Sequence, residues 1–193
     1  KLSAGGFKKF KLAVPPDVLR RIEFFASQFE FFETAGTQFE YMTKDTAHVS
    51  GAQWRDLVSA DNGRDRLKDL GCQTMNGLSV RNLMTLLLYA KAVAYFRGNK
   101  SVSLDDVRQI LPFVLQDKLH ADLDSPFFDL GENTAYKADR IGWLRYLFDS
   151  SCQEFVRLNL DEDDPVRDVH NEFAKGLEGL SHSVAHKRLV NIE

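Results

Sequence analysis

Cysteine is scarce in this chain of 193 residues, and long apolar runs are absent. The two cysteines, Cys72 and Cys152, stand far apart and lack the spacing of metal ligands, which argues against a disulfide scaffold and against a zinc site. Two thiols are typical of a protein from a reducing compartment, and we expect a cytoplasmic protein. The densest apolar run, residues 86–90, is far shorter than the roughly 20 residues that span a bilayer, so no membrane span is predicted.

An excess of positive charge is also absent. The formal net charge is −3 at pH 7, which argues against a nucleic-acid-binding protein. Proline and glycine number only 5 and 12, against 15 phenylalanines, so the chain is rich in core-forming residues and poor in loops. Because the chain begins at Lys1 rather than at methionine, we expect it to be cut from a longer protein.

Nearly every segment has the apolar spacing of an amphipathic helix, and an all-α fold is predicted. The first helix is expected to open at Pro15 and Pro16. Its apolar stripe consists of Val18, Ile22, Phe25, Phe29 and Phe32. Residues 34–48 are polar and predict a loop or a short irregular element. Residues 80–96 form a helix that is apolar most of the way round, and we expect other helices to bury it on several sides.

The connections after residue 96 carry clear turn and cap signals. Gly98 is expected in the left-handed conformation that ends many helices. Ser103 is expected to cap the next helix, whose first turn holds Asp105 and Asp106 near the positive end of the dipole. Residues 121–137 are rich in polar residues, proline and glycine, and predict a loop that is also the best candidate domain boundary.

Several chemical motifs are absent or incomplete. No phosphate-binding loop is present, since residues 98–101 resemble only the tail of one. His182 and His186 could share a helix face, but Ser183 replaces the glutamate of a metalloprotease helix, so we favour a solvated helix end and expect no metal. The acidic run at residues 161–164 lacks the glycine of an EF-hand loop and predicts a charged loop before a final helix.

The most informative motif opens the helix over residues 80–96. Gly77 and Ser79 precede the helix as a turn and a cap, and Arg81 lies in its first turn. An arginine at this place lies near the positive end of the helix dipole, which is mildly unfavourable. Taken alone, an exposed or salt-bridged arginine is the favoured interpretation. A guanidinium that responds to phosphate outside its own helix is the functional alternative.

Residues 77–119 resemble the helical lid of AAA+ ATPases of the MoxR family. The family's lid helix opens with Gly-x-Ser-x-Arg, continues through leucines and alanines, and leads through a glycine turn to a second capped helix. The matching positions here are Gly77, Ser79, Arg81, Gly98, Ser103, Asp105, Asp106 and Val107. Upstream, residues 14–19 and 49–54 resemble the RavA branch of the same family.

The resemblance implies a role for the motif and a setting for the chain. Arg81 matches the sensor-2 arginine, which reaches from the lid to the phosphates of ATP, and Ser79 lies beside it. Such ATPases form hexameric rings that act as chaperone-like remodellers. Expected partners are the AAA+ core of the same protein, neighbouring subunits of the ring and a protein client, with ATP and Mg²⁺ bound in the parent. The family's phosphate loop belongs to an α/β core that is absent here, so this chain alone is expected not to hydrolyse ATP.

We therefore expect an AAA+ lid-like helical domain at residues 1–120 and a helical C-terminal extension at residues 121–193. The extension, with the acidic loop at residues 161–164 and the aromatic turn at residues 125–128, is expected to bind neighbouring subunits or a client. The competing interpretation is a stand-alone helical interaction or regulatory module that never contacts nucleotide. A strand and a phosphate loop upstream of Lys1 would discriminate between the two.

Overall fold

The computed structural model of the chain describes residues 12–33, 41–57, 69–162, 168, 171, 174 and 181–184. The chain divides into two compact units, residues 1–153 and residues 154–193, and each is described by itself. The predicted boundary between lid and extension, after residue 120, differs from the boundary between these two units, after residue 153. The predicted division stays a prediction.

Helices dominate the described residues, which confirms the predicted all-α class. The helices are α1 (Pro16–Glu30), α2 (Lys44–Val49), α3 (Trp54–Leu57), α4 (Val80–Phe96), α5 (Leu104–Leu115) and α6 (Arg140–Arg157). Three short 3₁₀ turns accompany them, namely η1 (Leu70–Gln73), η2 (Pro126–Asp129) and η3 (Thr134–Lys137). The described strands are β1 (Phe31–Glu33) and β2 (Tyr41–Thr43), which pair antiparallel with Phe32 opposite Met42.

The first helix ends before its apolar stripe does. Four members of the stripe, from Val18 to Phe29, are buried on α1 as predicted. Phe32 instead lies in β1, so its predicted place on the helix is wrong. Within residues 34–48, predicted as a loop or a short irregular element, residues 41–43 form β2 and residues 44–48 belong to α2. Thr43 accepts a hydrogen bond from the Thr46 amide as the cap of α2.

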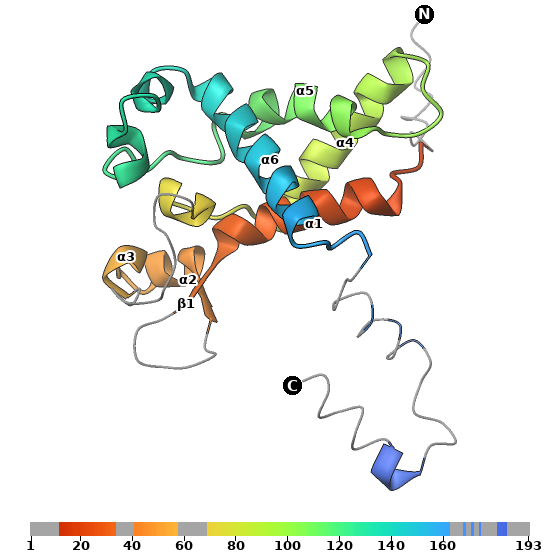
Figure 1. Cartoon of the computed structure of the whole chain (residues 1–193), viewed down its shortest axis with the longest axis horizontal. Coiled ribbons are helices and arrows are strands. Elements are labelled where there is room, and N and C mark those ends of the chain that lie inside the picture. Colours follow the sequence, from red (N-terminus) through yellow and green to blue (C-terminus); the bar gives the residue numbers. More distant parts are fainter. Residues whose placement is uncertain are drawn as a thin grey trace, which may run out of the picture. The chain divides into compact units, whose positions relative to one another are not determined.

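One apolar core joins α1, α4, α5 and α6, which lie together in Figure 1. Phe25 of α1 packs edge-on against Phe148 of α6, with ring centroids 5.5 Å apart. Trp143 is fully buried, and its indole nitrogen donates a hydrogen bond of 3.3 Å to the side-chain oxygen of Gln73. Large aromatic side chains of this kind contribute most to such a core because each buries a large apolar area.

The helix α4 is buried on one face only, so its predicted burial on several sides is wrong. Leu86, Ala90 and Ala94 face the core and are fully buried. On the opposite face, Val80, Met84 and Leu88 are 72%, 66% and 55% exposed. These residues, with the exposed Tyr95, recur at helical spacing and are called the α4 stripe below. An apolar sequence pattern does not by itself show on how many sides the chain covers a helix.

The segment predicted as a loop and boundary folds onto the core. Ala121 forms an isolated bridge with Thr74, and η2 and η3 follow. Phe127 and Phe128 in η2 are only 1% and 0% exposed, because their rings pack against Tyr146 and Trp143 of α6. The aromatic side chains of the 125–128 turn therefore belong to the core and are not exposed to a partner. The binding of a neighbouring subunit or client by the extension stays a prediction.

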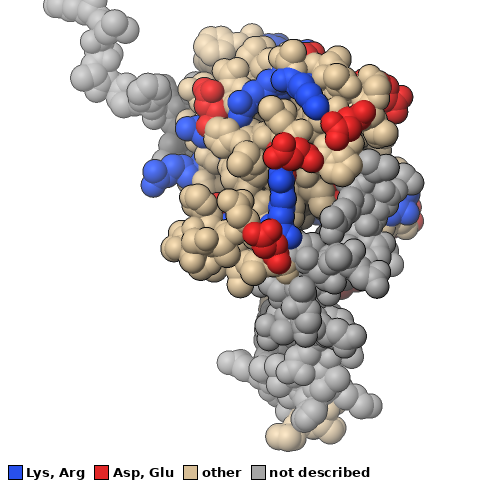
Figure 2. All heavy atoms as spheres, turned by 90° about the vertical axis from the view of Figure 1, so that its left-hand side faces the viewer, with Lys and Arg blue, Asp and Glu red and all other residues tan. Residues whose placement is uncertain are grey.

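Charge on the face that carries η2, η3 and α3 is mixed. Figure 2 shows lysine and arginine side chains there close to aspartate and glutamate side chains. The described part of this face thus offers nucleic acid no uniformly basic surface. Separately, none of the described helices has the length and apolar character needed to cross a membrane.

In the second unit, the structure describes residues 154–162 and a few isolated positions. Arg157 and Glu154 form a two-pronged ion pair in the last turn of α6, with nitrogen–oxygen distances of 2.7 and 2.5 Å. Asp161 and Glu162, the described half of the acidic run, lie in an exposed turn. The final helix predicted from Pro165 onward lies mostly outside the described residues.

Candidate functional site

Arg81 lies in the first turn of α4 with an exposed side chain. Among the residues that the structure describes, its guanidinium makes no hydrogen bond and no ion pair. Two other arginines are engaged, since Arg97 binds Asp106 and Arg108 binds Asp149 through both carboxylate oxygens, whereas Arg145 resembles Arg81 in making no such contact among the described residues. The donors of Arg81 are therefore available to a group outside the described part of the chain.

Ser79 occupies the N-cap position of α4 by its backbone, with φ −68° and ψ 154°. Its carbonyl oxygen accepts hydrogen bonds from the amides of Asn82 and Leu83, at 2.9 and 3.3 Å. Its hydroxyl makes no capping hydrogen bond, so the predicted cap exists in the backbone but not in the side chain. The first amides of a helix lack partners within the helix and carry partial positive charge. Together with the Arg81 guanidinium, these amides make the N-terminus of α4 suited to binding an anion.

The α4 stripe and Arg81 share one side of the helix. Residues three, four and seven positions apart lie next to each other on a helix surface, so Arg81 is adjacent to Met84 and Leu88. A positive group thus lies at the edge of an exposed apolar face. An exposed apolar face of this kind suits packing against another protein surface, and Arg81 at its N-terminal end could then reach a polar ligand.

The segment before α4, residues 70–79, is anchored by a buried lysine. Lys44 of α2 is 3% exposed, and its Nζ donates to the carbonyl of Gly71 at 2.6 Å, the carbonyl of Thr74 at 3.0 Å and the hydroxyl of Thr74 at 2.8 Å. The ammonium also lies 4.2 Å from the centre of the Trp54 ring, which adds a cation–π contact. All three donors of the ammonium are used. We call residues 70–79 the pre-α4 segment.

Burial lowers the pKa of Lys44 to about 8, from an ordinary value of 10.5. The nearby Cys72 and Asp69 oppose this shift, because negative charge favours the ammonium. Sequence reasoning missed Lys44, since a lysine in a polar stretch gives no sign that its side chain is buried. The helix pattern from Lys44 to Val49, with Ala47 inward, is the only signal that could have placed it.

Further contacts hold the pre-α4 segment on its other side. Asn76 Nδ2 donates to the carbonyls of Gly77 and Lys118, at 3.0 and 2.7 Å, and its Oδ1 accepts from the His120 amide at 2.8 Å. Gly77 packs directly on Glu30 of α1, so closely that a Cβ would collide with the Glu30 carboxylate. A larger residue at this position would force the Glu30 side chain to move and would crowd the Glu30 Cα, which lies 3.2 Å from the Cβ position. The start of α4 is tied in this way both to α1 and to the chain that leaves α5.

Burial raises the pKa of Glu30, and the charge of Asp45 acts in the same direction. A hydrogen bond from the Leu78 backbone partly opposes the increase. Glu30 therefore carries a carboxyl group whose charge is disfavoured next to the pre-α4 segment.

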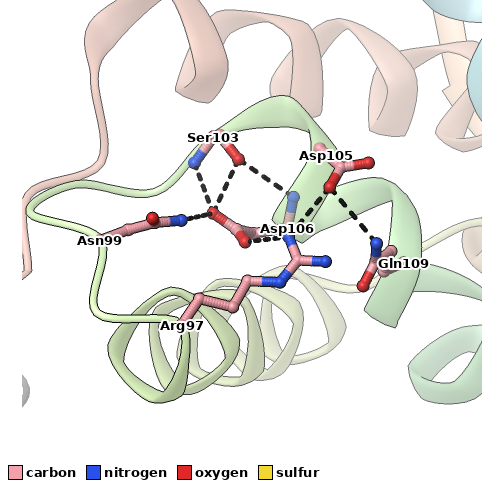
Figure 3. A network of polar contacts seen from close by, with 6 residues as sticks. All are labelled: Arg97, Asn99, Ser103, Asp105, Asp106 and Gln109. Carbon is pink, nitrogen blue, oxygen red and sulfur yellow. Dashed lines mark hydrogen bonds and ion pairs between the residues drawn. The ribbon is translucent and has the colours of Figure 1, made fainter.

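A second polar cluster ties the far end of α4 to the start of α5 (Figure 3). Arg97 donates to Asp105 at 2.9 Å and to Asp106 at 2.7 Å. Asp106 also accepts from the backbone and hydroxyl of Ser103, at 2.9 and 2.7 Å, and Ser103 accepts in return from the Asp106 amide. The predicted cap at Ser103 is confirmed, and Gly98 has the predicted left-handed φ of 75°.

The carboxylate of Asp106 is buried, and hydrogen bonds from the protein replace those that water would make to it. Burial by itself would raise the pKa of Asp106, but hydrogen bonds from Ser103, Arg97 and Asn99 together lower it. The charged form is thus the stable one in the fold. We call Arg97, Asn99, Ser103, Asp105 and Asp106 the α4–α5 clasp.

Metal binding finds no support among the described residues. No group of three or more histidine, cysteine, aspartate or glutamate side chains is placed there to hold a metal ion. His182 is described and exposed, whereas His186 lies outside the described residues. The interpretation of these two histidines as a solvated helix end stays a prediction.

Residues 72–137 match the family model described as the AAA lid domain. The matched segment contains Ser79, Arg81, the whole of α4 and α5, the α4–α5 clasp, and η2 and η3. No curated protein and no solved structure matches the chain. The match and the helical fold support one conclusion: this part of the chain is similar to the lid of an AAA+ ATPase.

Proposed function

We propose that this chain is the nucleotide-responsive lid and the C-terminal part of a MoxR-family AAA+ ATPase that acts as a chaperone-like remodeller. The match to an AAA lid domain over residues 72–137 supports the lid. The Gly77, Ser79 and Arg81 motif supports the MoxR subtype. Two free cysteines favour a cytoplasmic location for the parent protein.

The observation that carries this proposal is the exposed guanidinium of Arg81 at the start of α4. Its planar donors match the oxygens of a phosphate, and the unpaired amides at the helix start add to the attraction. Ser79 offers a hydroxyl beside them that no capping bond uses. MgATP, held by the AAA+ core of the same protein, supplies the phosphate charge to which these donors respond.

The α4 stripe gives this arginine a way to be held near the nucleotide. Packing of Met84 and Leu88 against the AAA+ core would remove apolar area from water and bring the start of α4 to the bound phosphates. Loss of the terminal phosphate then removes the partner of Arg81 and changes the angle of the lid. We propose that this change passes to neighbouring subunits of a hexameric ring and to a protein client.

The test is ATP turnover by the full-length parent protein, comparing wild type with Arg81→Ala. A charge-assisted contact to phosphate is worth about 1.5–3 kcal/mol, so turnover efficiency should fall by at least about tenfold. Arg145→Ala is the matched control, because Arg145 is also an exposed helical arginine without a hydrogen bond or ion pair among the described residues. Its activity should equal that of wild type.

The proposal fails if the parent protein hydrolyses no ATP, or if Arg81→Ala behaves like Arg145→Ala. Either result would favour a helical interaction module that makes no contact with nucleotide. The α4 stripe would then be the first surface on which to look for its partner.

A further inference from the structure

Lys44 is buried at a point where no reacting group is expected. A buried ammonium is uncommon because it loses its hydration, and proteins retain one where its hydrogen bonds have a definite task. Here all three donors are directed at Gly71 and Thr74, at distances between 2.6 and 3.0 Å. These two residues lie at the beginning of the pre-α4 segment, which ends at Ser79.

The pre-α4 segment is a short and well-anchored link between Lys44 and Arg81. Gly71, Thr74, Gly77 and Leu78 are buried along it. The Thr74 hydroxyl, which accepts from Lys44, in turn donates to the Gly71 carbonyl at 3.1 Å. A buried chain held this tightly transmits a shift at one end to the other, because close-packed groups cannot absorb it locally.

We propose that Lys44 is a positioning residue for Arg81, fixing the pre-α4 segment so that the first turn of α4 presents its guanidinium to the phosphates. This inference rests on the proposed role of Arg81. It assigns a function to a residue in α2, outside the segment that matches the AAA lid domain. Removing the ammonium leaves the Thr74 carbonyl without a donor among the described residues, whereas the Gly71 carbonyl keeps the Thr74 amide and hydroxyl. The pre-α4 segment is then expected to shift at Thr74 to find a new partner for this carbonyl. A displacement of about 1 Å in a positioning group can reduce its effect as much as a hundredfold.

The experiment is a double-mutant cycle in the full-length parent protein, with the affinity for MgATP as the readout. Lys44→Met keeps the length of the side chain and removes its donors. We expect Lys44→Met and Arg81→Ala each to weaken MgATP binding by about tenfold or more. The double variant should bind no more weakly than Arg81→Ala, because a residue that acts through Arg81 has nothing left to position.

Hydrogen exchange of the same variants provides a second readout. Lys44→Met should lower the protection of amides in residues 71–82, whereas Arg81→Ala should leave the amides of residues 71–78 as protected as in wild type. Lys137→Met is the matched control, since Lys137 of η3 binds, among the described residues, only the exposed Asp129 of η2, at 3.2 Å. It should change neither affinity nor exchange.

If Lys44→Met does not fold, Thr74→Val replaces it, because this change removes one hydroxyl and keeps the side-chain shape. Additive losses in the double variant would overturn the inference, since Lys44 would then act independently of Arg81. Wild-type affinity of Lys44→Met would overturn it as well, while leaving the role of Arg81 intact. Wild-type affinity of Arg81→Ala would instead remove the proposed function, and with it the premise of this inference.

Discussion

The α4–α5 clasp depends on one buried carboxylate, and its loss should destabilise the fold. Asp106 is 0% exposed and accepts from the Ser103 backbone, the Ser103 hydroxyl and Arg97, at distances of 2.7 to 2.9 Å. Its neighbour Asp105 also binds Arg97, at 2.9 Å, but is 62% exposed. The two aspartates therefore share a partner and differ in burial.

The magnitude follows from what Asp106→Ala leaves behind. The Ser103 hydroxyl still accepts from the amide of residue 106, so the substitution removes only the half of the capping box that the carboxylate makes. The amide and hydroxyl of Ser103 lose their charged acceptor, which costs roughly 1.5–3 kcal/mol. We therefore expect the free energy of unfolding to fall by about 1.5–3 kcal/mol. Asp105→Ala should change it by no more than about 0.5 kcal/mol, because exposed ion pairs contribute little.

Urea denaturation of the chain, followed by circular dichroism at pH 7, measures both values. The comparison is sensitive because the two variants remove the same chemical group one residue apart. Equal effects of the two substitutions would refute the reasoning from burial. A loss below about 0.5 kcal/mol for Asp106→Ala would show that water replaces the clasp without cost.

Two further predictions concern Lys44 and the core. Because the pKa of Lys44 is lowered from 10.5 to about 8, the unfolded chain binds more protons than the folded one between these values. As pH increases from 8 toward 10, the free energy of unfolding of wild type should therefore rise relative to that of Lys44→Met, by up to about 1.4 kcal/mol per pH unit. Urea denaturation at pH 7 and pH 9.5 measures this difference. If the free energies of unfolding of the two proteins change in parallel with pH, the prediction is contradicted. In the core, Phe128→Ala should lower the free energy of unfolding by about 3–5 kcal/mol, because Phe128 is fully buried. Met84→Ala on the exposed α4 stripe should lower it by less than about 0.5 kcal/mol. Similar shifts in the thermal unfolding temperature of both variants would contradict this difference.

Local signals in the sequence predict much of the helical framework. The serine before Asp105 and Asp106 predicts a cap, and Gly98 predicts a helix end, because both depend on backbone groups within a few residues. The apolar stripe from Val18 to Phe29 likewise predicts the buried face of α1. These features need no knowledge of distant parts of the chain.

Features that depend on distant packing could not be predicted in this way. Lys44 is buried because Gly71 and Thr74 offer it oxygen atoms almost thirty positions along the chain. Phe127 and Phe128 are covered by α6, although their segment has the composition of a surface loop. The α4 stripe shows the opposite case, in which the apolar side chains remain more than half exposed in the described part of the chain. Composition and periodicity describe a segment, whereas burial depends on what the rest of the chain brings to it.

The hairpin of α4 and α5 is fastened at both ends, by Asn76 and Lys118 at one end and by Arg97 and Asp106 at the other. Two helices joined in this manner, and packed with α1 and α6 in one core, resist sliding and splaying, so a tilt of this bundle carries both helices together. With 17 residues, α4 is about 25 Å long, and a tilt of about 10° around its first turn displaces its far end by about 4 Å. If Arg81 binds a phosphate as proposed, a small tilt at the first turn of α4 would become, at the turn of residues 97–103, a movement about as wide as a side chain.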